Sequence, residues 1–147
     1  MSTQWLLVAD ASRARILATD AALGSLLLVK ELEHPLSRLR SSELVTDGPG
    51  RSWSGPGGAV TAYDAPHDPA QLEHERFARE LAGELETGLA REDFDTLILV
   101  APPRFLGMLR RQLAPPVARC VRAEVGRDYS LVSLSELPGM LRPQLAA

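Results

Sequence analysis

The most suggestive side chain for catalysis is an aspartate that follows a short apolar run. Asp10 comes directly after residues 5–9, which have the composition of a strand buried on both faces. In a metal-dependent nuclease, carboxylates from separate elements hold Mg²⁺, and Asp10 would be the first of these ligands. The apolar run at residues 97–101 ends in Pro102 and Pro103, which leaves a magnesium ion short of ligands. We therefore favour Asp10 as a residue that caps a turn and keep the nuclease as the alternative.

Three histidines, His34, His67 and His74, invite a metal or acid–base interpretation. None of them forms the His-x-x-x-His or His-Glu-x-x-His spacing with which one helix directs two ligands at a zinc ion. Cys120 is the single cysteine, so neither a cysteine-based zinc cluster nor a disulfide within the chain is possible. We expect structural or solvated histidines, a small buried Cys120, no metal site and no cofactor.

Serine and glycine patterns do not predict an enzyme. Ser54, in Trp53-Ser54-Gly55, comes closest to a nucleophile elbow, but no strand precedes it and no helix follows. The glycines of residues 48–58 lack the Gly-x-x-x-x-Gly-Lys-Ser/Thr order of a phosphate-binding loop. Catalysis therefore stays an open question, and a non-enzymatic protein is favoured.

Basic side chains offer a different chemistry, the binding of an anion. Arg104 and Phe105 open a predicted helix directly after a strand, where free backbone N–H groups and the helix dipole favour negative charge. Arg38, Arg40 and Arg51 lie in a long predicted loop. Together they form a candidate anion-binding or RNA-binding surface, and the alternative is that they pair with nearby carboxylates or with solvent.

A predicted α/β arrangement positions these side chains. Apolar or alternating runs at hairpin spacing predict three consecutive antiparallel strands over residues 4–9, 13–19 and 26–32. Residues 33–68 lose this periodicity and are rich in glycine and proline, which predicts a long loop. Such loops are often functional, so this loop is the first place to look for a binding role.

The second half of the chain alternates helical and strand patterns. A helix is predicted to begin at Asp68-Pro69, where Asp68 caps and Pro69 suits the first helical position, and its apolar residues recur every four positions. Further elements are predicted as a strand at 96–101, a helix at 104–113, a helical turn at 117–121, a strand at 129–132 and a helix at 136–145. The order predicts one α/β domain over residues 1–147, with a mixed sheet of about five strands and packed helices.

The composition bounds the class of protein. The chain has 147 residues, of which 45% are hydrophobic and 24% charged, which is typical of a folded globular domain. A formal charge of −3 argues against a protein that coats nucleic acid through bulk charge, although a local basic surface remains compatible with it. We see no signal peptide and no apolar run near the ~20 residues that span a bilayer, so we expect a cytoplasmic protein without membrane insertion.

Five stretches in the same order resemble the bacterial host attachment protein family: residues 5–16, 31–38, 47–52, 75–81 and 99–107. The resemblance covers nearly the whole chain. It implies a fold similar to the middle domain of archaeal and eukaryotic peptide-release factors, which shares its element order with the ribonuclease H architecture. Fold similarity of this kind does not fix function.

In those release factors the equivalent loop carries a Gly-Gly-Gln motif, whereas this chain has Gly57-Gly58-Ala59. The resemblance therefore implies a non-enzymatic interaction protein, with the ribosome or RNA as expected partner. Its binding residues would be Arg38, Arg51, Gly57, Gly58, Arg104 and Phe105. Two alternatives stay open: a hydrolase or nuclease that uses Asp10, and a self-associating protein that forms a homo-oligomer.

Overall fold

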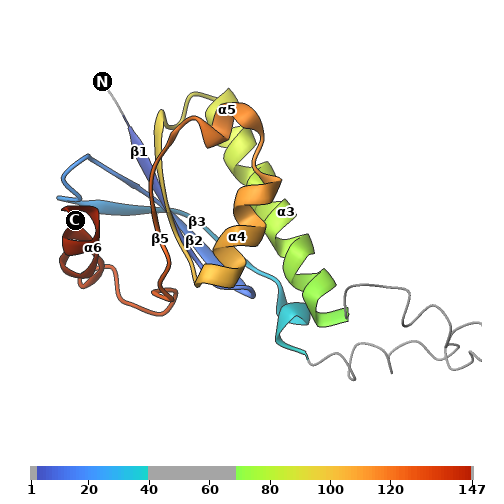
Figure 1. Ribbon diagram of the computed structural model, residues 1–147. Coiled ribbons are helices and arrows are strands. Elements are labelled where there is room, and N and C mark those ends of the chain that lie inside the picture. Colours follow the sequence, from blue (N-terminus) through green and yellow to red (C-terminus); the bar gives the residue numbers. More distant parts are fainter. Residues whose placement is uncertain (1–2, 40–68, 147) are drawn as a thin grey trace, which may run out of the picture.

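The computed structural model describes residues 3–39 and 69–146. These residues form five strands, four α-helices and one short 3-10 helix (Figure 1). In chain order the elements are β1 (Gln4–Ala9), β2 (Arg13–Thr19), β3 (Leu26–Glu33), η1 (Pro35–Arg38), α3 (Pro69–Ala90), β4 (Thr96–Val100), α4 (Pro103–Gln112), α5 (Pro115–Ala118), β5 (Val121–Val125) and α6 (Leu137–Ala146).

The five strands form one mixed sheet in the order β3-β2-β1-β4-β5. β1 to β3 are the predicted antiparallel meander, while β4 and β5 join parallel to β1 and to each other. The parallel pairs require crossovers, which α3 and then α4 with α5 provide. This confirms the predicted α/β class and the mixed sheet of about five strands.

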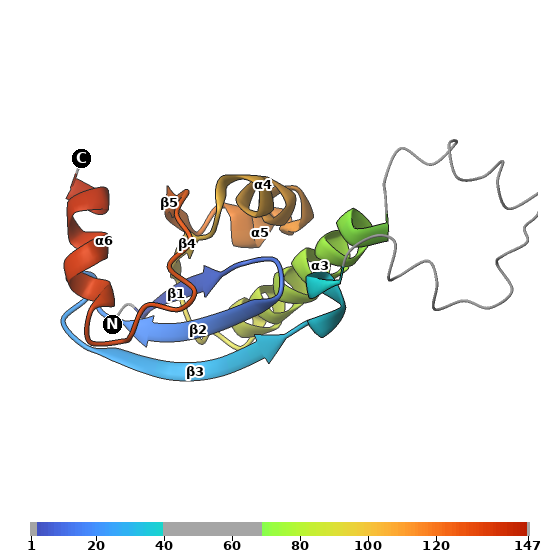
Figure 2. The ribbon, with the colours of Figure 1, turned by 90° about the horizontal axis from the view of Figure 1, so that it is seen from below.

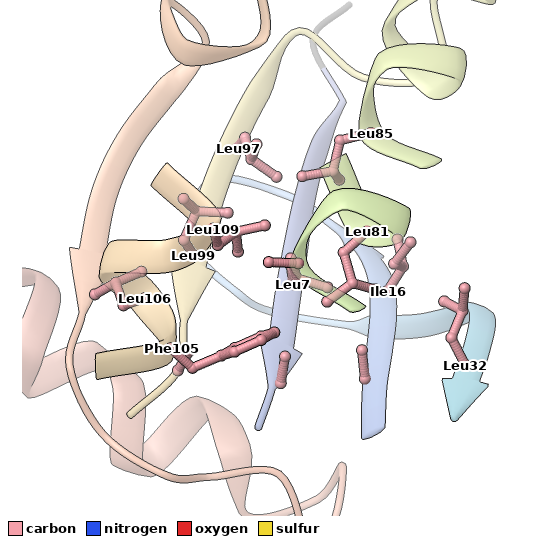
Figure 3. Packing of buried hydrophobic residues seen from close by; sticks show 14 of the residues in the cluster. Leu7, Ile16, Leu32, Leu81, Leu85, Leu97, Leu99, Phe105, Leu106 and Leu109 are labelled. Atoms are coloured by element: carbon pink, nitrogen blue, oxygen red, sulfur yellow. The ribbon is translucent and has the colours of Figure 1, made fainter. Parts of the chain in front are cut away.

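The two faces of the sheet bury separate apolar cores, because successive side chains of a strand point to opposite faces. Leu7 of β1 contributes to the core beneath α3, α4 and α5, whereas Leu6 and Val8 contribute to the core beneath α6. Figure 2 shows α6 at one end of the sheet, well apart from α3, α4 and α5. In Figure 3, Leu7 and Ile16 of the sheet meet Leu81 of α3, and α4 packs beside them.

One predicted element is wrong. The last strand is Val121–Val125, not residues 129–132, which form turns on the core beneath α6. β5 is an edge strand with exposed Arg122 and Glu124, so its sequence lacks the apolar run of a central strand. Tyr129 and Val132 pack against the core beneath α6, which accounts for the apolar residues in this stretch without a strand.

No helix in the described ranges is long and apolar enough to cross a membrane.

Candidate functional site

Asp10 lies at the carboxyl-terminal end of β1 and holds the tight connection to β2 together. Its Oδ1 accepts hydrogen bonds from the backbone N–H of Ser12 at 2.8 Å and of Arg13 at 2.9 Å, and from the Ser12 hydroxyl at 3.1 Å. The Asp10 N–H donates to the Arg13 carbonyl at 2.9 Å. This is the geometry of an aspartate that stabilises a turn through its own backbone neighbours.

The second oxygen of Asp10 is also engaged. Its Oδ2 accepts a hydrogen bond at 3.0 Å from the hydroxyl of Ser130, which is buried and also lies 2.7 Å from Oδ1 of Asp128. Partial burial acts to raise the pKa of Asp10, but the hydrogen bonds from Ser12, Ser130 and Arg13 outweigh it, so the pKa lies below its usual value. Asp10 is therefore ionised at neutral pH, and both its oxygens accept hydrogen bonds.

Asp128 and Ser130 were missed by the sequence reasoning. Both lie in the connection from β5 to α6, and β5 is parallel to β4, so residues after β5 reach the same edge of the sheet as Asp10. Because the last strand was predicted at residues 129–132, Asp128 was placed before a strand and not after one. The signal in the sequence that could have found this site is a carboxylate, Asp128, soon after the charged edge strand β5.

These carboxylates do not make up a metal site. Within residues 3–39 and 69–146, no three His, Cys, Asp or Glu side chains are grouped so that they could hold a metal ion. The end of β4 leads into α4 through Pro102 and Pro103, as the sequence indicated, and supplies no carboxylate there. The described geometry gives Asp10 a structural role and offers no support for a nuclease.

Arg38 lies beside the Asp10 turn. It ends η1, and its Nε donates to the Ser12 hydroxyl at 3.3 Å, while its NH2 lies 3.8 Å from Oε1 of Glu33. The Arg38 side chain is 41% exposed. The structure thus brings a sequence-predicted arginine to the same edge as Asp10, with donors still open to solvent.

Arg104 and Phe105 point to different surroundings although they are neighbours in α4. Arg104 is exposed, and its NH2 donates to the amide oxygen of Gln71 in α3 at 3.3 Å. Phe105 is only 3% exposed, and its ring stacks on Phe77 with centroids 6.0 Å apart. Phe105 therefore belongs to the core and has no face for a ligand, which corrects the expectation that it lines a binding surface.

The histidines with described positions are hydrogen-bonded within the fold. His34 Nε2 lies 2.8 Å from Oε1 of Glu73, and the ring stacks on Phe77. His74 Nε2 lies 3.0 Å from the Ser37 carbonyl. These contacts fix η1 on the first turns of α3. Glu73 is a buried carboxylate of α3, held between His34 and Arg76.

Two further arginines line a shallow pocket of about 250 Å³ on the face of the sheet that carries the core beneath α6. Arg13 and Arg15 of β2 share it with Glu31, Glu33 and Ser130. The Nε atoms of both arginines are buried without a hydrogen-bond partner, and burial lowers the pKa of Arg15. Since two carboxylates line the same pocket, its charge is balanced and it does not favour an anion.

The remaining sequence candidates lie outside the described residues: Arg40, Arg51, Gly57, Gly58 and His67. Of the predicted basic surface, the structure therefore places Arg38 and Arg104. Cys120 is partly buried, with its Sγ 3.4 Å from the Pro116 carbonyl.

Comparison with known proteins gives one family and a fold. The family model described as "Protein required for attachment to host cells" matches residues 5–141. Among solved structures, an "Archaeal protein" matches with a TM-score of 0.50 at 14% identity, covering 97% of this chain and 34% of that chain. The archaeal translation termination factor aRF1 matches with a TM-score of 0.46 at 12% identity, covering 98% of this chain and 38% of that chain. No curated protein sequence matches the chain.

The chain thus spans little more than a third of the length of these two solved proteins. At such low identity the likeness to the first of them concerns the fold alone.

Proposed function

The chain belongs to the family of proteins required for attachment to host cells, and we propose that it acts as a non-catalytic binding protein whose ligand is RNA, in the first place the RNA of the ribosome. The proposal places its action in the cytoplasm, where ribosomes are found. Attachment to a host would then be an indirect result of altered translation.

One observation carries the proposal: two exposed arginines flank the edge where β1 and β4 end. Arg38 lies beside the turn that follows β1, and Arg104 lies in the first turn of the helix that follows β4. Arg38 forms a long ion pair with Glu33 at 3.8 Å, and Arg104 donates to the neutral amide of Gln71. Both guanidinium groups therefore retain charge and donors for phosphate oxygens.

The two arginines also stand near the points where residues 40–68 join the described fold. That segment leaves after Leu39, next to Arg38, and re-enters at Pro69, two residues before the Gln71 partner of Arg104. It carries Arg51 and the Gly57-Gly58 pair. The segment also carries four acidic residues, Glu43, Asp47, Asp64 and Asp68, so the positive charge of the proposed surface rests on Arg38 and Arg104.

Co-sedimentation with purified ribosomes tests the proposal. The wild-type protein should pellet with ribosomes at ~50 mM salt and much less at ~200 mM, because phosphate contacts release counterions. An Arg38→Ala, Arg104→Ala variant should bind more weakly and lose about one unit of salt slope per arginine.

The matched control removes the same charge from the other edge of the sheet. Arg91 follows α3 and Arg119 follows α5, both are exposed, and they lie at the side where β4 and β5 begin. An Arg91→Ala, Arg119→Ala variant should pellet like the wild type. Absence of pelleting by the wild type at either salt concentration, or an equal loss in both variants, would overturn the proposal.

A further inference from the structure

A pocket of about 330 Å³ lies between the connection from β2 to β3 and the last turns of α6. Figure 2 shows α6 beside this connection. The pocket is lined by Arg122 of β5, Arg142 of α6 and five aliphatic residues, which are Leu23, Leu145 and three alanines. No acidic side chain of the described residues lines it, whereas three other pockets of the fold each have two carboxylates in their lining. This pocket is therefore both apolar and positively charged.

The connection from β2 to β3 holds both guanidinium groups through its main-chain oxygens. Arg142 donates from Nε to the Ala22 carbonyl and from Nη2 to the Leu23 carbonyl, both at 3.1 Å. Arg122 donates from Nη1 to the Ala21 carbonyl at 3.4 Å. Carbonyl oxygens are neutral acceptors, so two like charges from different elements are held at one pocket although they repel each other.

A buried amide also positions Arg122. Gln4 is 4% exposed, its Oε1 accepts a hydrogen bond from Nη1 of Arg122 at 2.9 Å, and its Nε2 donates to the Asp20 carbonyl at 3.0 Å. Arg122 thus makes its hydrogen bonds to the described residues through Nη1 alone. The donors that remain for a ligand are Nε and Nη2 of Arg122 and Nη1 of Arg142.

The carboxylates close to these arginines in the chain are engaged elsewhere. Oδ1 of Asp20 accepts hydrogen bonds from the N–H groups of Ala22 at 3.1 Å and of Gly24 at 2.8 Å, so Asp20 stabilises its own turn. Glu124 pairs with Arg110 of α4. Neither guanidinium group at the pocket forms an ion pair with a carboxylate of the described ranges. A bound anion would therefore offset the repulsion between the two positive charges.

We propose that this pocket binds a small carboxylate with a short aliphatic tail. The carboxylate accepts charge-assisted hydrogen bonds from the open donors of Arg122 and Arg142. The tail packs against Leu23 and Leu145, which supply the apolar lining that ligand pockets usually have. The volume is near the lower end of the range of ~300–1,000 Å³ for such pockets, so the ligand is small. The site lies at the end of the sheet where β1 begins, opposite the edge proposed to bind RNA, and does not depend on that proposal.

An NMR titration of the ¹⁵N-labelled full chain with sodium hexanoate at constant ionic strength tests the site. The amide signals of Ala22 and Leu23 should shift until saturation, with a dissociation constant in the millimolar range, as expected for a ligand of few non-hydrogen atoms. Acetate lacks the tail and hexanamide lacks the charge, so each should bind at least about tenfold more weakly.

Two variants with matched controls test the two arginines and the position of the ligand. Arg122→Met removes a charge but keeps an unbranched side chain, and should weaken hexanoate binding by about tenfold or more. Ala22→Glu adds a negative charge at an exposed residue of the lining and should weaken it similarly. The controls are Arg79→Met, at an exposed arginine of α3, and Ser25→Glu, at an exposed residue of the same connection outside the lining. Both should bind hexanoate like the wild type.

The same spectra report whether each variant is folded. Ala22→Glu decides the question even if Arg122→Met disturbs the packing of Gln4, because Ala22 is exposed and keeps its main-chain hydrogen bonds. The proposal is overturned if the wild type shows no saturating shift, if hexanamide or acetate binds as well as hexanoate, or if folded Ala22→Glu retains the affinity of the wild type.

Discussion

At the residue scale, Asp10 shows how local hydrogen bonding decides the role of a carboxylate. Four donors reach its two oxygens: two backbone N–H groups and the hydroxyls of Ser12 and Ser130. A general base needs an oxygen open to the substrate, and a metal ligand needs neighbouring carboxylates that point to the same position. Asp10 instead links the β1–β2 turn to the connection that follows β5.

This role predicts the effect of Asp10→Asn on stability. The variant should lower the free energy of unfolding by about 1 kcal/mol at neutral pH, since it keeps a turn-capping oxygen but loses the charge that strengthens the hydrogen bonds. The pKa of Asp10 is depressed in the folded state, so its contribution is complete above the unfolded pKa near ~3.9 and is lost as the pH falls through the folded pKa. The difference in the free energy of unfolding between Asp10→Asn and the wild type should therefore become smaller at acidic pH.

Urea unfolding at neutral and at acidic pH measures this difference. Asp93→Asn, at an exposed aspartate after α3, serves as the control and should change stability little at either pH. An unchanged stability of Asp10→Asn at neutral pH would contradict the structural role.

At the scale of elements, α3 carries two glycines in opposite surroundings. A Cβ on Gly88 would lie 2.5 Å from Cη2 of Trp5, whereas a Cβ on Gly83 would meet nothing within 4 Å. Gly88→Ala should therefore destabilise the protein by about 1–3 kcal/mol through overpacking. Gly83→Ala should stabilise it by about 0.5–1 kcal/mol, because alanine loses less backbone entropy in a helix.

Thermal unfolding of both variants checks the prediction, and the two substitutions control for each other because they change the same residue type in the same helix. Equal shifts in Tm would show that Gly88 does not mark a close approach of α3 to β1.

The elements predicted correctly from the sequence are those in which the pattern of apolar residues reflects which faces of the element are buried. β1 from Trp5 onward and β4 from Leu97 onward are apolar because both faces are covered, and α3 shows an apolar stripe. β5 was missed because its Arg122 and Glu124 face solvent, and the burial of Glu73 depends on His34, 39 residues away. The Asp10–Ser130 contact joins residues 120 apart, so it depends on the strand order and not on any local pattern.

At the scale of the whole molecule, the sheet joins two cores that share no side chains. Trp5 and Phe77 belong to the core beneath α3, and Leu137 and Leu141 belong to the core beneath α6. Because alternate residues of β1 and β4 contribute to both cores, loss of either core exposes the strands that support the other. We therefore expect the described domain to unfold as one cooperative unit.

Leu141→Ala tests this cooperativity. Leu141 is fully buried, so the substitution should destabilise the protein by about 2–5 kcal/mol. In a Trp53→Phe background, Trp5 is the single tryptophan and reports on the opposite core. With Leu141→Ala, the unfolding transitions followed by Trp5 fluorescence and by far-ultraviolet circular dichroism should both move to lower urea concentration and share one midpoint. Met140→Ala, at an exposed position of the same helix, should leave the midpoints of both transitions unchanged. If ellipticity fell at lower urea than the Trp5 signal changed, α6 would unfold separately and the two cores would be independent.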